Sequence, residues 1–510
     1  MSDSLWQFPG GLLLRGHKKR STQRPIQKMP LSRLLVLPLQ QHIGTAAVPI
    51  VEVGDRVLKG QCIARAEGHV SVNLHAPSSG VITAIEEQPV PHPSGLSAPC
   101  ITIETDGEDR WIERQRLDNF RDYSAHELRQ RIREAGIVGL GGAGFPSFIK
   151  LNPGIHQAAE MLLINGAECE PYISCDDMLM RERAEGILDG IEIMLFALHA
   201  KHCVLAIEDN KPEAIAAMRL ALAQRPALSQ MSIVVVPTRY PTGGEKQLIQ
   251  TVTGKQVPTN KLPIDIGIIC HNPGTAYAVG RAILHGEPLI SRIVTVTGTQ
   301  VAQPGNVETL FGTPIKELLT FCATQRQPGE PFIQGGPMMG YSLNKDELPI
   351  TKTANCILVG VEDAAPSSPP LPCIRCGDCA DVCPASLLPQ QLYWYARAKD
   401  FDKTGDYNLF DCIECGCCDY VCPSKIPLVS YFRFAKTEIM NQQRERQKAD
   451  LARERHENRQ ARLAREQQEK EARQRQRKAA LAAAKAAQAK QNTTAATQAE
   501  PTDAEVEEKA

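Results

Sequence analysis

The spacing of apolar residues divides this 510-residue chain into regions that predict different kinds of structure. Between residues 31 and 110, short β-branched runs are separated by turn residues, which is typical of a small all-β module. Residues 1–30 are polar and basic and show no periodicity. They therefore predict an N-terminal arm rather than a packed element.

Beyond residue 120 the chain mixes two periodicities. Helical spacing covers residues 128–135 and 212–223, and short apolar runs typical of strands occupy residues 161–164, 202–207, 232–236 and 266–269. Strands that alternate with helices predict an α/β domain over residues 120–285.

Three further regions complete the chain. Residues 286–345 predict a compact β-grasp unit, and a linker rich in proline and serine leads into a cysteine-rich region at 365–435. Residues 436–510 are rich in Arg, Gln, Glu, Lys and Ala without an apolar stripe, so they predict a solvated helix that ends in disorder. The expected fold class is multidomain, α/β and α+β.

The composition fits a multidomain globular protein and argues against several other classes. Hydrophobic residues make up 42% and charged residues 23% of the chain, and the net charge of -1 gives no indication of nucleic-acid binding. The early apolar run 34–39 is far shorter than the ~20 residues of a membrane-spanning helix, and the first residues lack the order of a signal peptide. We expect a cytoplasmic chain without a transmembrane segment of its own.

The 17 cysteines are the strongest chemical signal in the chain. Eight are scattered singly and are interpreted as small buried hydrophobic side chains. The other nine fall in two bursts, 373–384 and 412–423, which repeat the pattern C-x2-C-x2-C-x3-C-P. Ferredoxins hold [4Fe-4S] clusters with this spacing, so the predicted metal ligands are Cys373, Cys376, Cys379, Cys383, Cys412, Cys415, Cys418 and Cys422.

Zinc is the alternative metal, because C-x2-C pairs also build tetrahedral zinc sites. A zinc site needs only four ligands in two pairs and explains neither the third cysteine nor the repeated Cys-Pro. Cys417 breaks the two-residue gap and is interpreted as a non-ligand. In two-cluster ferredoxins the fourth cysteine serves the other cluster. That resemblance predicts one cluster on Cys373, Cys376, Cys379 and Cys422, and a second on Cys412, Cys415, Cys418 and Cys383.

A glycine-rich loop at residues 139–144 is the candidate for a nucleotide or flavin site. Its glycines satisfy G-x-G-x-x-G, a pattern that lets the backbone approach a phosphate or a ring. The loop follows a helical stretch rather than a strand, and Pro146 comes soon after it, so the usual Rossmann context is missing. Taken alone, a plain glycine-rich turn explains the pattern as well.

The motifs around this loop resemble the NADH-binding flavoprotein subunit of respiratory complex I. They are residues 136–146 with Lys150, then 165–171, 240–245 and 271–275, in the order that family uses. The resemblance implies a Rossmann-like flavoprotein domain that binds FMN through Gly139, Gly141, Gly142, Gly144, Lys150, Asn165, Glu168, Gly243, Gly244, Asn272 and Thr275. Phe145, Glu170 and Glu245 would face the dinucleotide. The chain departs from that family at Leu140, Ala167 and Gly244.

The all-β module at 31–110 resembles the barrel-sandwich hybrid of lipoyl and biotinyl carriers through its Val-Gly-Asp-x-Val and Ala-Pro-x-x-Gly turns. Carriers present a modifiable lysine at a hairpin tip. The corresponding residues here are Ala66, Glu67, Gly68 and His69, so a structural or docking role is favoured over a carrier role.

The order of all these modules resembles the C subunit of the Rnf electron-transport complex, called Rsx in some bacteria, with 286–345 as an SLBB-like β-grasp unit. The resemblance implies a peripheral protein on the cytoplasmic face of the bacterial inner membrane. Membrane-embedded and peripheral subunits of the same complex would be its partners, and ion translocation would be coupled to its electron transfer.

The resemblance also implies an NADH-dependent oxidoreductase. FMN would convert the two-electron hydride into single electrons, which leave through two [4Fe-4S] clusters. No catalytic acid or base is assigned, because hydride transfer to a flavin needs none. The sequence favours neither direction of electron flow. The alternative from another class is a non-catalytic iron-sulfur relay with a vestigial flavin pocket.

Overall fold

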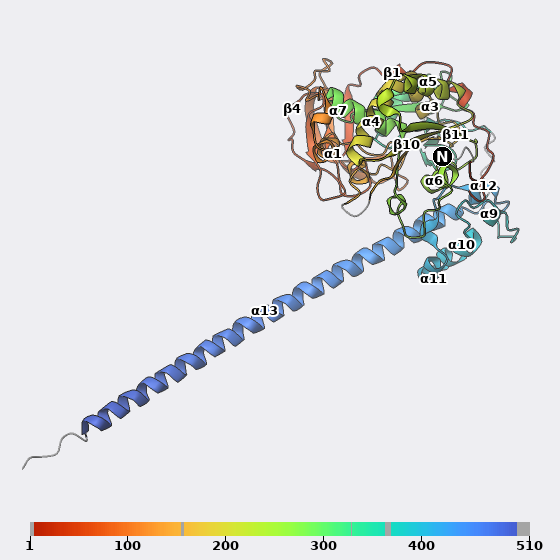
Figure 1. Ribbon diagram of the computed structural model, residues 1–510. Coiled ribbons are helices and arrows are strands. Elements are labelled where there is room, and N and C mark those ends of the chain that lie inside the picture. The colour runs from red at the N-terminus through yellow and green to blue at the C-terminus, as the bar shows by residue number, and fades with distance from the viewer. Residues whose placement is uncertain (1–4, 155–157, 328, 363–368, 497–510) are drawn as a thin grey trace, which may run out of the picture. The chain divides into compact units, whose positions relative to one another are not determined.

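The computed structural model describes residues 5–154, 158–327, 329–362 and 369–496 (Figure 1). The chain divides into two units, Met1–Ala435 and Lys436–Ala510. The first unit holds every strand among the described residues, arranged in four sheets, together with the cysteine-rich region.

The N-terminal module is all-β, as predicted. Its strands form a four-stranded antiparallel sheet in the order β2-β8-β7-β4 and a three-stranded one in the order β3-β5-β6. They are β2 (Leu34–Pro38), β3 (Val48–Pro49), β4 (Arg56–Val57), β5 (Cys62–Arg65), β6 (Leu74–His75), β7 (Gly80–Pro89) and β8 (Ser97–Thr105). Leu35, Leu37, Ile101 and Ile103 alternate along β2 and β8 and are fully buried, so one face of the larger sheet forms the core.

The central region is a parallel α/β sheet in the order β11-β10-β9-β12. Its strands are β9 (Met161–Gly166), β10 (His202–Glu208), β11 (Met231–Val236) and β12 (Ile268–His271). Its helices are α1 (Ala125–Glu134), α2 (Ser147–Lys150), α3 (Cys175–Glu182), α4 (Ala184–Leu198), α5 (Pro212–Ala223), α6 (Glu245–Thr253) and α7 (Pro273–His285). The predicted α/β pattern is confirmed, and the predicted helix 212–223 coincides with α5.

Both faces of this sheet are covered, which explains its nearly continuous apolar strands. On β9, Leu163 packs into the core that includes Leu248 of α6, whereas its neighbour Leu162 packs into the core that includes Ile191 of α4. The strand predicted at residues 266–269 is β12, which begins two residues later, at Ile268. Gly267 has a φ of 76° and ends a short 3-10 helix, Pro263–Ile266, before β12 starts.

A six-stranded mixed sheet in the order β1-β14-β13-β17-β15-β16 follows. It consists of β1 (Gln27–Lys28), β13 (Ser291–Thr297), β14 (Gly305–Leu310), β15 (Phe332–Gln334), β16 (Tyr341–Leu343) and β17 (Cys356–Leu358), with helix α8 (Ile315–Phe321). This sheet reaches beyond the predicted unit 286–345 at both ends, because β17 lies after it and β1 comes from the N-terminal arm. The arm therefore packs on the first unit instead of extending freely.

The cysteine-rich region is built twice from the same local structure. Gly377 and Gly416 are left-handed, with φ of 95° and 77°, and each precedes a short helix, α9 (Asp378–Asp381) or α12 (Cys417–Val421). Helices α10 (Pro389–Ala398) and α11 (Phe401–Asp406) connect the two bursts. The internal repeat in the sequence is thus a repeat in the backbone.

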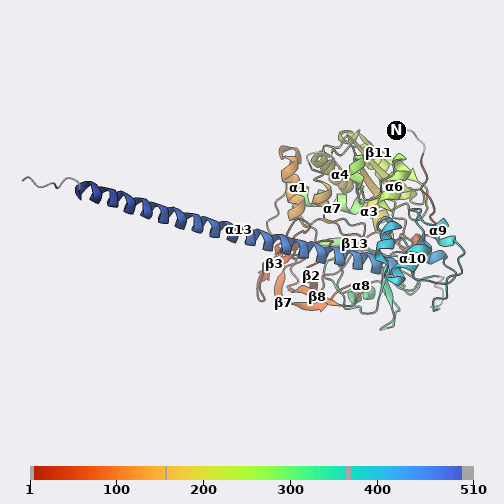
Figure 2. The same ribbon diagram turned by 90° about the horizontal axis from the view of Figure 1, so that it is seen from below.

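Helix α13 (Leu428–Ala496) begins in the first unit and forms all of the second unit that the structure describes (Figure 2). Every described side chain from residue 441 to 490 is exposed, as the predicted solvated helix requires. Within the described part of the chain, we find no helix with the length and hydropathy needed to cross a membrane.

The second unit should be dispensable for cofactor binding. We expect a chain that ends after Met440 to keep its full iron content, because every described side chain from residue 441 to 490 is exposed and the segment has no packed face of its own. Iron analysis of the shortened and full-length proteins checks this. A shortened protein that has lost its iron would contradict the expectation.

Candidate cofactor sites

The predicted flavin residues converge at one edge of the parallel sheet. The strand order reverses between β9 and β12, since β10 and β11 lie on one side of β9 and β12 lies on the other. Ligands of open α/β sheets bind beyond the carboxyl ends of the strands at such a point. Asn165 lies near the end of β9, and Asn272 directly follows β12.

The glycine-rich loop lies against this edge. The Leu140 amide donates to Thr275 Oγ1 at 2.9 Å, and a Cβ on Gly141 would lie 3.5 Å from the Cβ of Asn272. Gly139 donates to the Phe145 carbonyl at 2.8 Å, which closes the loop. Gly142 is exposed and open, so its backbone is free to meet a ligand.

Two predicted residues are held in left-handed or close-packed positions. Gly144 has a φ of 64°, and a Cβ there would lie 2.8 Å from Thr353 Cγ2. A Cβ on Gly243 would lie 2.9 Å from Cys169 Sγ. Asn165 joins the end of β9 to the segment of Gly243, because its Nδ2 donates to the Gly243 carbonyl at 2.8 Å.

The predicted carboxylates are engaged with the protein itself. Glu168 accepts hydrogen bonds from the amides of Asp176 (2.7 Å) and Asp177 (3.3 Å) at the start of α3. Glu170 accepts from the amides of Met338 (2.7 Å) and Met339 (3.0 Å), and burial raises its pKa. Glu170 therefore faces the segment after β15 rather than the edge with Asn272.

Lys150 and Glu245 meet each other across the edge. Lys150 Nζ lies 2.7 Å from Glu245 Oε1 and 3.2 Å from the Cys270 carbonyl. Burial is the largest single effect and disfavours the charge on Lys150, but the attraction of Glu245 and Cys270 and the hydrogen bond to Glu245 together raise the pKa of Lys150. A cation is thus held at the site at neutral pH. Gly244, next to this pair, precedes α6 at its N-terminus.

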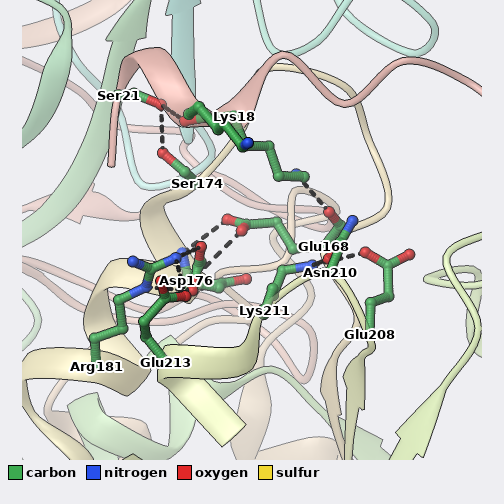
Figure 3. Close-up of polar contacts among 12 residues, drawn as sticks. Lys18, Ser21, Glu168, Ser174, Asp176, Arg181, Glu208, Asn210, Lys211 and Glu213 are labelled. Carbon is green, nitrogen blue, oxygen red and sulfur yellow. Dashed lines mark hydrogen bonds and ion pairs between the residues drawn. The ribbon is translucent and has the colours of Figure 1, made fainter. Parts of the chain in front are cut away.

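Several charged residues near this edge were not predicted from the sequence (Figure 3). Lys211 is fully buried, and its Nζ contacts Glu208 Oε2 at 2.6 Å and the Ala167 carbonyl. Asp176 accepts from Asn272 Nδ2 at 2.6 Å, and burial together with nearby Glu168 raises its pKa to about 7. The sequence held one signal for the buried pair, since a Glu and a Lys three residues apart lie between a predicted strand and a predicted helix.

A cavity of ≈ 700 Å³ lies behind the glycine loop. Its lining includes Leu140, Asp176 and Trp111, which directly follows the N-terminal module. Several of its charged residues pair with one another, as in Arg183 with Glu308 and Lys59 with Asp109. We assign it no ligand.

The cysteines surround two small cavities, and each cavity mixes the two bursts. Cys373, Cys376, Cys379 and Cys422 line one. Cys383, Cys412, Cys415 and Cys418 line the other, together with Cys417. Four sulfur ligands suit a cubane cluster, and the grouping matches the predicted exchange of the fourth cysteine.

Backbone geometry fits thiolate ligands at both cavities. Arg375 and Glu414 occupy equivalent positions in the repeat, and both have a φ of 57°. The Arg375 amide donates to Cys373 Sγ and the Glu414 amide to Cys412 Sγ, each at 3.4 Å. The Leu387 amide lies 3.3 Å from Cys383 Sγ. Amide donors stabilise negative charge on sulfur, so both sites fit iron-sulfur clusters.

The second cavity adjoins the flavin-type edge. Tyr240 Oη donates to the Cys415 carbonyl at 2.6 Å, and Gln247 Nε2 donates to the Pro384 carbonyl at 3.3 Å. Lys246 lies 3.0 Å from Asp411. The segment 240–247 therefore connects the two candidate sites directly.

Similarity to known proteins agrees with this arrangement. The C subunit of an ion-translocating oxidoreductase complex of Pseudomonas aeruginosa is 53% identical over 453 residues, covering 89% of this chain and 58% of that protein. The corresponding protein of Haemophilus influenzae strain PittEE is 46% identical over 454 residues, covering 89% and 69%. This chain belongs to the RnfC family, the C subunits of ion-translocating oxidoreductase complexes. The family predicted from the sequence is confirmed.

Four family models match in the same order as the modules of this RnfC-family chain. They are the RnfC barrel sandwich hybrid domain at 6–108, the Nuo51 FMN-binding domain at 132–281, the SLBB domain at 293–342 and a 4Fe-4S dicluster domain at 372–426. The multidomain α/β fold class is confirmed at this level. The chain spans 58%, 62% and 65% of the length of relatives from Pseudomonas aeruginosa, Serratia proteamaculans and Pectobacterium atrosepticum.

Among solved structures, an NAD+-reducing [NiFe]-hydrogenase in the H2-reduced state is similar with a TM-score of 0.44 and 19% identity. The match covers 58% of this chain and 59% of that one. We base no assignment on this likeness.

Proposed function

We propose that this chain is the electron-input subunit of a membrane-bound complex that couples electron transfer to ion translocation. Electrons pass from NADH through FMN and two [4Fe-4S] clusters to partner subunits. One observation carries the proposal: the Tyr240–Cys415 hydrogen bond joins the flavin-type edge to the cavity lined by Cys383, Cys412, Cys415, Cys417 and Cys418. Family membership and the FMN-binding and dicluster matches support it.

The residues at the sheet edge suit FMN. The backbone is open at Gly142, and a Cβ at Gly139 or Gly141 would meet its first neighbour only at 3.5 Å, so the loop accommodates a ring or phosphate. Lys150 offers a positive charge to the phosphate. Asn165, Gly243, Asn272 and Thr275 complete the lining. When bound, FMN supplies the conversion between a two-electron hydride and single electrons. The chain's own task is to hold and orient the two reactants, so no side chain acts as a general acid or base.

NADH would lie on the outer side of this edge. Phe145 is half-buried and offers a ring, and Glu245 lies beside Lys150. Glu170 contributes by binding the amides of Met338 and Met339, and Met338 packs against the apolar cluster that includes Tyr240 and Cys415. The same contacts serve NADH oxidation and NAD+ reduction. The direction of electron flow therefore depends on the reduction potentials of the electron donor and acceptor.

The two clusters would have different roles. The one on Cys383, Cys412, Cys415 and Cys418 adjoins the flavin edge, and two of these cysteines, Cys415 and Cys418, are buried. The one on Cys373, Cys376, Cys379 and Cys422 has the exposed Cys376 and, next to it, Ile374 with 68% exposure. Electrons would enter at the buried cluster and leave at the exposed one, where a redox partner can approach.

The partners are other members of the same complex, membrane-embedded and peripheral, and we place the chain on the cytoplasmic face of the bacterial inner membrane. The name of the family describes a component of an ion-translocating complex. A peripheral position is consistent with that description.

A non-catalytic relay is the second candidate. Leu140, Ala167 and Gly244 replace residues of the complex I family, and Lys150 and Glu245 neutralise each other at the edge. These features favour a site that has lost its affinity for flavin.

Cofactor extraction separates the two candidates. We expect purified protein to contain about one FMN and about eight iron atoms per chain, since each cubane holds four. Acid extraction with a visible spectrum measures both. Full iron without flavin, even after incubation with FMN, would favour the relay.

A further inference from the structure

Lys18 of the N-terminal segment reaches into the flavin-type edge (Figure 3). Its Nζ donates to the carbonyls of Glu168 (2.8 Å) and Glu170 (3.0 Å) and to that of Ile173. An ammonium group has three donors and no acceptor, so these three carbonyls use its full capacity. The contact spans about 150 residues of sequence.

The loop that Lys18 holds is strained. Glu168 has a φ of 47° and Tyr172 a φ of 70°, although neither is glycine. Left-handed backbone at such residues is unfavourable and persists only where surrounding contacts enforce it. The Tyr172 amide donates to the Gly16 carbonyl at 2.7 Å, and the His17 ring stacks on Tyr172 at 4.7 Å. The N-terminal segment thus supplies these enforcing contacts.

The same segment touches the cluster region at its other end. Leu12 exchanges backbone hydrogen bonds with Tyr240 at 2.7 and 2.8 Å, and Gly11 donates to the Val382 carbonyl at 2.9 Å. Gly10 packs so closely that a Cβ would lie 2.5 Å from Val382 and 2.7 Å from the carbonyl carbon of Cys383. Tyr240 in turn contacts Cys415. Residues 8–21, here named the strap, therefore join the loop 168–173 to both cysteine bursts.

We propose that the strap is a positioning element of the electron-transfer site, with Lys18 as its key positioning residue. Lys18 acts through the loop 168–173, whose backbone it fixes so that Glu168 caps α3 and Glu170 binds the amides of Met338 and Met339. The inference rests on the proposed function, because it assigns the strap to the site that receives NADH and passes electrons to the cluster beside Tyr240.

The test compares Lys18→Met, Lys18→Arg and the control Lys19→Met in the full-length protein. Methionine keeps the length of the side chain but leaves three carbonyls without their donor. Arginine keeps the charge, but its planar fork cannot direct its donors to the same three points. Lys19 is the exposed neighbour, so its replacement changes the net charge equally without touching the loop.

The readouts are the KM for NADH and kcat with ferricyanide, which takes electrons from the flavin, together with flavin and iron content. We expect Lys18→Met to raise the KM by about tenfold to a hundredfold, as displaced positioning groups do, while iron content stays unchanged. The KM of Lys18→Arg should lie between those of the wild type and Lys18→Met, and the KM of Lys19→Met should equal that of the wild type.

Three outcomes decide the inference. If the wild-type protein oxidises NADH and Lys18→Met has the same KM, the inference is overturned. If the wild-type protein does not oxidise NADH, the proposed function is refuted instead. If Lys18→Met does not fold, hydrogen exchange of Lys18→Arg is measured. Amide exchange that is faster than in the wild type, and only at residues 168–177, supports the positioning role of the strap. Unchanged exchange at these residues overturns it.

Discussion

Replacing Cys383 by alanine is expected to remove the cluster of the second burst, although Cys383 belongs to the first. Its side chain lines the cavity of Cys412, Cys415 and Cys418, and Cys422 completes the cavity of the first burst. A cubane that loses a thiolate ligand is lost or altered, so iron content should fall from about eight to about four per chain. Electron paramagnetic resonance of the reduced protein identifies which signal disappears.

The reference variants are Cys415→Ala and Cys376→Ala. Cys383→Ala should lose the same signal as Cys415→Ala. If it matches Cys376→Ala instead, each burst closes on its own cluster and the exchange is wrong. Cys417→Ala serves as the matched control, because this cysteine lines the second cavity yet is assigned as a non-ligand; it should keep both signals.

Gly141→Val is expected to abolish flavin binding and to spare both clusters. A Cβ at Gly141 would lie 3.5 Å from Asn272 Cβ, an ordinary contact, so the fold tolerates it. The two further methyl groups of valine would project from the loop and keep a flavin ring or phosphate from approaching its backbone. Flavin affinity should fall at least tenfold, which corresponds to about 1.4 kcal/mol of binding free energy.

Gly405→Val is the control for this variant. A Cβ at Gly405 meets no atom within 4 Å, and the residue lies in α11, away from the glycine loop. We expect wild-type flavin and iron in that protein. If Gly141→Val retains flavin and still oxidises NADH, the glycine loop is not part of the flavin site.

The sequence predicted the parts of this protein that repeat or alternate. The two cysteine bursts share one spacing, and its resemblance to that of two-cluster ferredoxins predicted the grouping of Cys422 with Cys373 and of Cys383 with Cys412. The same cysteines line the two cavities. The apolar runs of β9, β10 and β11 are long enough to show their periodicity, so the parallel sheet was predictable.

Other features left no local pattern. Strands β1 and β17 have only two and three residues, too few for a period to be visible. Lys18 lies in a polar segment, and its role depends on carbonyls about 150 residues away. The family motifs placed Glu170 beside the dinucleotide, but only the structure shows its carboxylate bound to Met338 and Met339. Contacts between distant segments decide these positions, and single-residue patterns do not encode them.

The most direct test of the electron path is anaerobic, rapid mixing of the purified protein with NADH, followed by absorbance and electron paramagnetic resonance. We expect the flavin to bleach first and the cluster absorbance to fall afterwards, since the flavin accepts the hydride and the clusters accept its electrons singly. If the cluster potentials lie below that of NADH, the reverse mixing of reduced protein with NAD+ should produce NADH. Transfer in neither direction, in protein whose flavin and clusters are reduced by dithionite, would contradict the proposed path.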